Sequence, residues 1–225
     1  MAKPAKTKTA GAQRKIFLVE DHPVFRDGLA KLINSEPDLD VCGEAGDARA
    51  GLKGIRKLQP DLAVVDLGLP GKSGLELIKE IRAAKSEAKI LVVSMFDEAL
   101  YAQRVLRAGG DGYIMKQEDP QEIIAAIRDV LEGHIYVSED VFARTTLKKS
   151  SDEEFAGALD LLTDFELEVL ELLGQGSSQE EIADQLRLKP NDVVAHSESI
   201  RRKLKLKSQN ALVRYAVCWI EDTCR

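Results

Sequence analysis

The most constraining stretch of this sequence is a short apolar run that ends in a carboxylate. Residues 62–65 are Leu-Ala-Val-Val, Asp66 follows, and Gly68 and Pro70 then break the pattern. A short, β-branched run without alternation is typical of a strand covered on both faces, as in a parallel sheet. Asp66 then lies at the carboxyl end of that strand, where ligands bind in open α/β sheets. Because burying an unpartnered carboxylate costs several kcal/mol, we expect Asp66 to cap a helix or to share a crevice with a cation.

Strand-like and helix-like patterns alternate along the first part of the chain. Apolar runs predict strands at residues 16–19, 39–45, 62–67, 90–94 and 112–116. Apolar residues at helical spacing predict helices at residues 23–35, 48–58, 74–84, 99–108 and 120–132. Strict alternation of this kind favours an α/β fold, a doubly wound, five-stranded parallel sheet of the flavodoxin-like type, with helices on both faces.

Polar side chains follow four of these five strands. Glu20 and Asp21 follow the first strand and Asp66 the third, whereas Ser94 ends the fourth and Lys116 the fifth. Each has an ordinary role when taken alone, as a helix-start acid, a turn hydroxyl or a solvated lysine. Together they place three carboxylates at one edge, where repulsion raises their pKa values unless a cation such as Mg²⁺ is bound. The amine and the hydroxyl suit the oxygens of a transferred phosphoryl group.

Residues 16–134 resemble the receiver domain of bacterial response regulators. The matching residues are Glu20-Asp21, Asp66 with Leu69-Pro70-Gly71-x-x-Gly74, Ser94, and Tyr113-Ile114-Met115-Lys116. The resemblance implies that Asp66 accepts a phosphoryl group from a sensor histidine kinase and that Ser94 and Lys116 contact its oxygens. It also implies a cofactor, Mg²⁺, held by Asp21, Asp66, the carbonyl of Gly68 and, through water, Glu20.

The resemblance further implies a switch that couples Ser94 to Tyr113. Packing of a half-buried aromatic side chain accounts for Tyr113 equally well, so both interpretations stay open. His22, after the acidic pair, is interpreted as packing at the start of a helix. We expect no enzymatic activity beyond self-phosphorylation from a phosphodonor and autodephosphorylation, since the sequence shows no further catalytic residues.

The rest of the chain predicts a linker and a small all-α domain. Residues 135–158 include a possible short helix from Ser138 and a polar stretch without periodicity, which is typical of a linker. Residues 159–225 contain capping boxes at Thr163 and Ser178, a third helix opened by Pro190, and a fourth helix at residues 211–220. Short helices joined by brief turns indicate a four-helix helix-turn-helix domain.

This second domain resembles the DNA-binding output domain of the NarL/FixJ class (LuxR-type). The resemblance lies in its scaffold, whereas its DNA-reading surface is atypical. The candidate DNA-binding residues are Val194, Ala195, Glu198, Arg201, Arg202, Lys203 and Lys205. Glu198 would be repelled by phosphates, and the basic residues are explained equally well as a solvated helix end. The leading hypothesis is a phosphorylation-dependent transcription regulator; the alternative is a degenerate helix-turn-helix that acts through protein-protein interaction.

Composition limits the setting in which such a protein works. The net charge is −6, so DNA binding needs a local basic patch. Residues 1–15 carry bases but no acids and predict a disordered basic tail. Three cysteines without a C-x-x-C pair argue against disulfide and zinc frameworks. No run is long enough for a membrane helix, so we expect a cytoplasmic protein without membrane contacts. Phosphorylation of Asp66 is expected to shift the receiver toward a state that forms a homodimer or releases the linker.

Overall fold

A computed structural model describes residues 13–138, 159 and 161–223. The predicted linker helix and most of the predicted basic tail lie outside the described residues. The N-terminal domain contains one parallel sheet with the strand order β2-β1-β3-β4-β5, which confirms the predicted fold class. Its strands are β1 (Arg14–Val19), β2 (Leu39–Ala45), β3 (Leu62–Val65), β4 (Lys89–Ser94) and β5 (Gly112–Met115).

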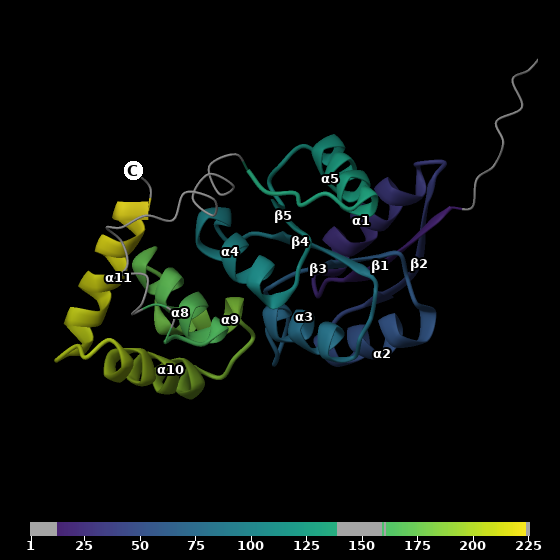
Figure 1. Cartoon of the computed structure of the whole chain (residues 1–225). Helices are drawn as coiled ribbons and strands as arrows, with labels where there is room; N and C mark the ends of the chain where they lie inside the picture. The colour runs from purple at the N-terminus through teal and green to yellow at the C-terminus, as the bar shows by residue number, and fades with distance from the viewer. Residues whose placement is uncertain (1–12, 139–158, 160, 224–225) are drawn as a thin grey trace, which may run out of the picture.

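Helices cover both faces of this sheet (Figure 1). One face is covered by α1 (Pro23–Asn34) and α5 (Pro120–Glu132), and the other by α2 (Ala48–Leu58), α3 (Gly74–Ala83) and α4 (Glu98–Ala108). Successive strand residues point to opposite faces, so Leu18 and Val64 pack beneath α1 and α5, whereas Val19 and Val65 pack against α2 and α3. The central strands are therefore buried on both sides, as their unalternated apolar runs predicted.

Two strand ends differ from the sequence expectation. The strand β1 begins at Arg14, two residues before the predicted start, because the carboxylate of Asp61 accepts hydrogen bonds from the Arg14 guanidinium at 2.9 Å and from the Lys15 backbone at 2.7 Å. Arg14 and Lys15 therefore belong to the sheet and not to a tail. Strand β3 ends at Val65, and the Asp66 backbone still donates to Val19 at 2.9 Å. Asp66 is thus held at the sheet edge by the neighbouring strand.

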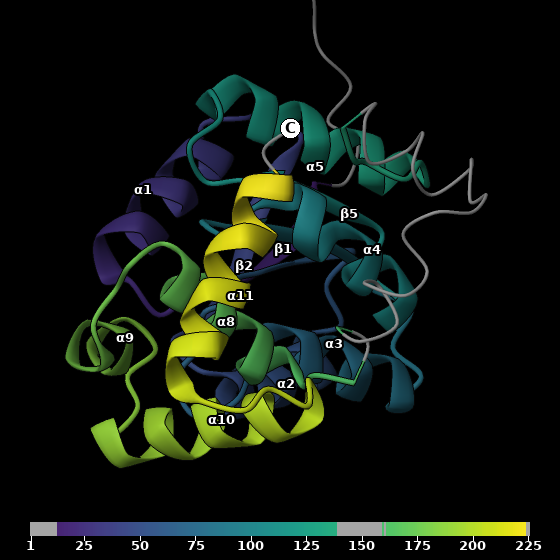
Figure 2. The same cartoon turned by 90° about the vertical axis from the view of Figure 1, so that its left-hand side faces the viewer.

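The C-terminal domain is helical, as predicted (Figure 2). It contains α8 (Asp164–Gly174), α9 (Gln179–Gln185), α10 (Pro190–Lys203) and α11 (Gln209–Thr223). Both predicted capping boxes are present, with Thr163 and Glu166 opening α8 and Ser178 and Glu181 opening α9. Leu167 and Leu170 of α8 are buried among the other helices, and Trp219 belongs to the same core.

The two domains touch each other through α4. The guanidinium of Arg104 on α4 donates hydrogen bonds to the carbonyl oxygens of Leu159 at 2.6 Å and of Leu162 at 3.3 Å, immediately before α8. Tyr101 on the same helix is fully buried beside Glu171 of α8. The C-terminal domain therefore covers one side of α4 in this structure.

Candidate functional site

Three carboxylates gather beyond the carboxyl ends of β1 and β3. Glu20, Asp21 and Asp66 are 3%, 5% and 4% exposed. One ligand atom from each of these side chains and from His22 lies within 4.8 Å of the others. Placing three acids at one edge follows from the parallel sheet, since β1 and β3 are neighbours with their carboxyl ends side by side. The resulting acid pocket is the feature around which the other candidate residues lie.

Lys116 forms ion pairs with two of these acids. Its Nζ lies 2.7 Å from Oε2 of Glu20 and 2.8 Å from Oδ2 of Asp66, and 4.7 Å from the centre of the Phe25 ring. Burial by itself would lower the pKa of Lys116, but the carboxylates of Asp66 and Glu20 outweigh it and raise that pKa. Burial and the adjacent Asp66 raise the pKa of Glu20 despite the lysine. One ammonium group does not fully compensate this cluster.

The third acid, Asp21, has different neighbours. Its Oδ1 lies 2.8 Å from Nδ1 of His22 without an aligned hydrogen bond, and its Oδ2 lies 2.9 Å from a guanidinium nitrogen of Arg187. Mg²⁺ prefers hard oxygen ligands, and the three buried carboxylates of the acid pocket provide them. One of these oxygens, Oδ1 of Asp21, has no hydrogen-bond donor in the described structure. The sequence interpretation missed Arg187 altogether and did not place His22 against the acids.

Two glycines bring backbone close to Asp66. A Cβ placed on Gly68 would lie 3.7 Å from Oδ2 of Asp66, so the backbone of Gly68 borders the acid pocket. A Cβ on Gly74, the first residue of α3, would lie 2.1 Å from the carbonyl oxygen of Asp66. The backbone of Gly74 also donates to Leu67 at 2.9 Å. Only glycine therefore allows α3 to begin this close to the end of β3.

Ser94 is the last residue of β4, and Tyr113 lies on the neighbouring strand β5. Both residues have no exposed surface. The Tyr113 hydroxyl donates to the carbonyl oxygen of Phe96 at 2.8 Å, and the Phe96 backbone donates to the Ser94 hydroxyl at 3.4 Å. Burial raises the pKa of Tyr113 well above its usual value, so this hydroxyl stays protonated. Tyr113 is fully buried and not half-buried, and its hydroxyl bonds to the segment between β4 and α4.

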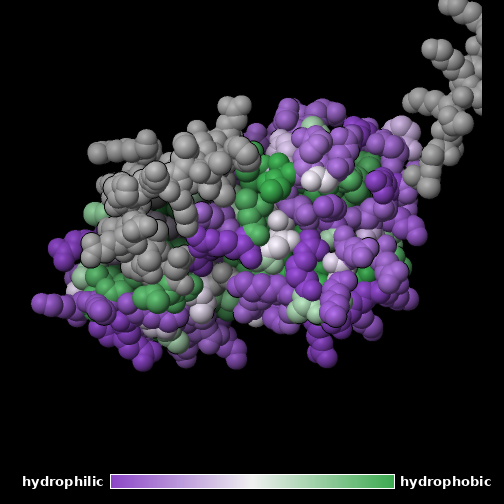
Figure 3. All heavy atoms as spheres, viewed as in Figure 1, coloured by the Kyte–Doolittle hydropathy of each residue, from purple (hydrophilic) through white to green (hydrophobic). Residues whose placement is uncertain are grey.

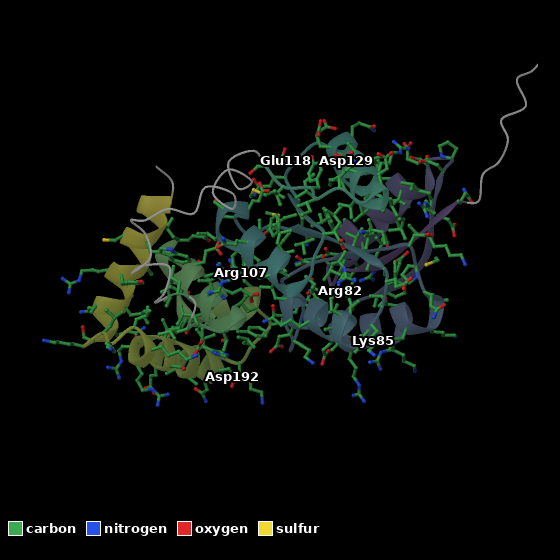
Figure 4. The ribbon with its side chains drawn as sticks, in the orientation of Figure 1. Arg82, Lys85, Arg107, Glu118, Asp129 and Asp192 are labelled. Carbon is green, nitrogen blue, oxygen red and sulfur yellow. The ribbon has the colours of Figure 1, made fainter. Side chains whose placement is uncertain are left out.

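The candidate DNA-reading residues lie on α10 and just beyond it. The exposed members are Val194, Ala195, Glu198, Arg202 and Lys205. Figure 3 shows a mostly hydrophilic surface over the lower edge of this domain, where α10 lies, and in Figure 4 Asp192 marks the first turn of the helix.

Two of the candidate basic side chains form contacts within their own domain. Lys203 lies 2.6 Å from the carboxylate of Glu166, and Arg201 donates to the backbone of Leu206 at 3.3 Å. Although burial opposes it, hydrogen bonding from Lys203, Ser199 and Thr163 lowers the pKa of Glu166 to about 2. Arg202 and Lys205 are therefore more accessible to a phosphate backbone than Arg201 and Lys203.

The surface of α8 that faces α4 contains an unusual buried acid. Glu171 is 3% exposed and lies near Tyr101 and the N-terminal end of α4 at Asp97. Burial raises the pKa of Glu171 to about 7, and the nearby charge of Asp97 adds to the rise. Arg107 extends from α4 toward this domain (Figure 4) and lines a pocket of about 610 Å³ together with Phe165 and His196. The contact between the domains is thus polar and titratable.

Glu171→Gln should change how stability depends on pH. Because the folded-state pKa of Glu171 is raised from 4.5 to about 7, the stability contributed by the neutral carboxyl is fully present below pH 4.5 and is lost as pH rises through 7. At about pH 8 we expect the free energy of unfolding of the variant to exceed that of the original protein by roughly 1–3 kcal/mol, with little difference at about pH 5. Urea unfolding at both pH values measures this. Glu180→Gln, on the exposed part of α9, is the control. An equal difference at the two pH values contradicts the assignment.

Comparisons with known proteins agree with this arrangement. The family model for the response regulator receiver domain matches residues 16–128, and the model for bacterial regulatory proteins of the LuxR family matches residues 160–216. The oxygen regulatory protein NreC of Staphylococcus aureus is 36% identical over 211 residues, which are 90% of this chain and 96% of that protein.

Solved structures of response regulators are also similar to this chain. A LuxR-family two-component response regulator from Aurantimonas sp. SI85-9A1 is 35% identical with a TM-score of 0.57, over 61% of this chain and all of that one. RcsB from Salmonella enterica serovar Typhimurium, bound to the promoter rprA with the phosphomimetic BeF3⁻, is 25% identical with a TM-score of 0.59, over 91% of this chain and 98% of that one. Among the described residues, no helix has both the length and the apolar character needed to cross a membrane.

Proposed function

Because the chain belongs to the LuxR-type response regulators, we propose that phosphorylation of Asp66 controls how its C-terminal helix-turn-helix domain binds DNA. The protein combines a receiver domain with a LuxR-type DNA-binding domain and acts in transcription control. The observation that carries the proposal is the position of Asp66, with two further acids, Lys116 and Ser94 at the same edge of the sheet.

The residues around Asp66 suit one phosphoryl transfer. A carboxylate oxygen of Asp66 forms a bond to phosphorus while the bond from phosphorus to a histidine nitrogen of the kinase breaks, and that nitrogen keeps the electron pair. Lys116, which contacts Asp66 in this structure, would bind the phosphoryl oxygens, and the Ser94 hydroxyl would join it, since β4 ends at the same edge of the sheet. Asp21, Asp66 and Glu20, with the carbonyl of Gly68, would hold Mg²⁺, which supplies positive charge against the acids and the incoming phosphoryl group. We propose no enzymatic activity beyond this self-phosphorylation and its hydrolysis.

The same geometry supplies a switch. Ser94 ends β4 at the same edge of the sheet as Asp66, and the hydroxyl of the buried Tyr113 bonds to Phe96 in the loop before α4. A Ser94 hydroxyl drawn to a phosphoryl oxygen would alter the packing around Tyr113 and Phe96, and hence the helix that carries the C-terminal domain. A ligand shifts such an equilibrium only through contacts that differ between the two states, and these contacts provide the difference.

The partners follow from the two domains. We propose a sensor histidine kinase as the phosphoryl source, and bacterial DNA in the cytoplasm as the target, contacted through α10 and the exposed bases Arg202 and Lys205. We further propose that the phosphorylated protein forms homodimers, since a helix-turn-helix pair reads two half-sites about one helical turn apart. Val194, Ala195 and Glu198 would face the base edges, and Arg201 and Lys203 would contribute once released from their contacts within the domain.

Fluorescence anisotropy with upstream fragments from the organism's own genome tests this function. The protein is titrated with and without a small phosphodonor and Mg²⁺, at several salt concentrations. Phosphorylated protein should bind a subset of fragments more tightly, with an affinity that falls as salt rises, because phosphate contacts release counterions. Binding that never depends on salt, in either phosphorylation state, would overturn the proposed DNA-binding function.

A further inference from the structure

The acid pocket receives a cation from the other domain. Lys116 contacts Glu20 and Asp66, so its ammonium group serves two of the three carboxylates. The side chain that contacts Oδ2 of Asp21 is Arg187, at 2.9 Å, and Arg187 belongs to the helix-turn-helix domain. Asp21 is almost completely buried, with a side chain that is 2% exposed, whereas the Arg187 side chain is 45% exposed. The guanidinium thus enters the mouth of the pocket from outside the receiver domain.

The position of Arg187 is fixed by the turn between α9 and α10. Its backbone has a left-handed φ of 49°, an uncommon conformation for a residue with a side chain. The neighbouring Leu188 donates to Ala183 at 2.8 Å, and Arg187 itself donates to Asp184 at 3.3 Å, so the turn is tied to α9. Arg187 therefore reaches Asp21 only while the C-terminal domain is docked in this orientation.

The charges explain why this contact matters. Three carboxylates face two protein cations, Lys116 and Arg187, so docking of Arg187 removes part of the negative charge that Lys116 leaves uncompensated. Asp21 is also one of the carboxylates that would hold a divalent cation in the proposed function. A guanidinium and Mg²⁺ repel each other and need the same carboxylate, and in a buried site this repulsion is weakly screened.

We propose that Arg187 is a competitor of the metal: its contact with Asp21 closes the acid pocket against Mg²⁺ and, by the same contact, holds the DNA-binding domain against the receiver domain. This inference rests on the proposed function, because it takes the acid pocket to be the Mg²⁺ site. Thermodynamic linkage makes this effect reciprocal. If docking of the DNA-binding domain weakens Mg²⁺ binding by some factor, then bound Mg²⁺ weakens docking by the same factor. Binding of Mg²⁺, which phosphorylation requires, would therefore weaken the docking of the DNA-binding domain before any phosphoryl group is transferred.

Isothermal titration calorimetry of the full chain with Mg²⁺ alone tests the competition. Arg187→Met removes the charge but keeps an unbranched side chain of similar reach, and it should bind Mg²⁺ roughly tenfold more tightly than the original protein. Arg187→Lys keeps a positive charge and should fall between the two. Arg214→Met, an exposed arginine on α11, controls for the loss of one positive charge and should leave the Mg²⁺ affinity unchanged.

A second readout follows docking directly. Small-angle X-ray scattering should show that the original protein expands when Mg²⁺ is added, and that Arg187→Met is already expanded without it. Equal Mg²⁺ affinities for the original protein and Arg187→Met would overturn the competition while leaving the proposed function standing. If neither protein binds Mg²⁺, the assignment of the acid pocket as a metal site fails, and the competition fails with it.

Discussion

Asp66→Asn is expected to give a folded protein that no longer takes up a phosphoryl group. The amide cannot act as the nucleophile, since its nitrogen lone pair is delocalised and no charged oxygen remains. The fold should persist, because the change removes one of three mutually repelling buried carboxylates and keeps the size of the side chain. The amide also still offers an oxygen to Lys116. Intact-protein mass spectrometry after incubation with a small phosphodonor and Mg²⁺ measures the loss, which should be complete.

The matched control for this variant is Asp47→Asn. Asp47 caps α2, where its side chain accepts a hydrogen bond from the Ala50 backbone at 2.8 Å, and asparagine caps a helix about as well as aspartate. Asp47→Asn should therefore be phosphorylated like the original protein. If Asp66→Asn still takes up one phosphoryl group, Asp66 is not the acceptor.

Gly74→Ala should have the largest effect on stability. The new Cβ would lie 2.1 Å from the carbonyl oxygen of Asp66 and 2.8 Å from the Cα of Leu67, and both are backbone atoms that a rotamer change cannot move. The start of α3 or the end of β3 must shift, at a cost of about 3 kcal/mol or more. Such a shift also displaces Asp66 itself. Urea unfolding followed by circular dichroism measures the loss, and phosphoryl uptake should fall in parallel.

Gly28→Ala provides the comparison at another helical glycine. Gly28 lies within α1, and a Cβ there meets no atom within 4 Å. Alanine should stabilise this position by roughly 0.5–1 kcal/mol, because glycine loses more backbone entropy on folding. Two identical substitutions in helices of the same domain are thus expected to have opposite signs. A Gly74→Ala protein as stable as the original would show that α3 does not depend on this close approach.

The fold of the N-terminal domain was predictable because its signals are local. The Leu62–Val65 run has no polar residue to place on an exposed face, so it indicates a central strand of a parallel sheet, and the structure confirms it. The capping boxes at Thr163 and Ser178 are equally local, and both helices begin where they predict. The start of β1 at Arg14 was missed because it depends on Asp61, a residue distant in sequence.

The members of the acid pocket were predictable from one topological rule. Since parallel strands end at a common edge, Glu20, Asp21 and Asp66 had to approach one another once their strands were recognised. The complete burial of Tyr113 was not predictable, because it depends on how the segment before α4 folds over the sheet. The pairing of Lys203 with Glu166 joins the end of α10 to the start of α8, which no local pattern reports.

The approach of Arg187 to Asp21 lay furthest from what the sequence could indicate. It joins a turn of the C-terminal domain to the loop after β1, so it depends on how two independently patterned domains dock. The hydrogen bonds from Arg104 to the segment before α8 also depend on how the two domains dock. Hydrophobic periodicity predicts what lies inside a domain, whereas interfaces between domains resemble ordinary polar surface in sequence.

Mapping the phosphoryl group on the original protein shows directly whether Asp66 is the metal-dependent acceptor. The protein is treated with a small phosphodonor in the presence of Mg²⁺ or of a chelator, digested, and analysed by tandem mass spectrometry. We expect a single phosphoryl group per chain, on the peptide that contains Asp66, and almost none when the metal is chelated. Labelling at another residue, or equal labelling of Asp66 without metal, would contradict it.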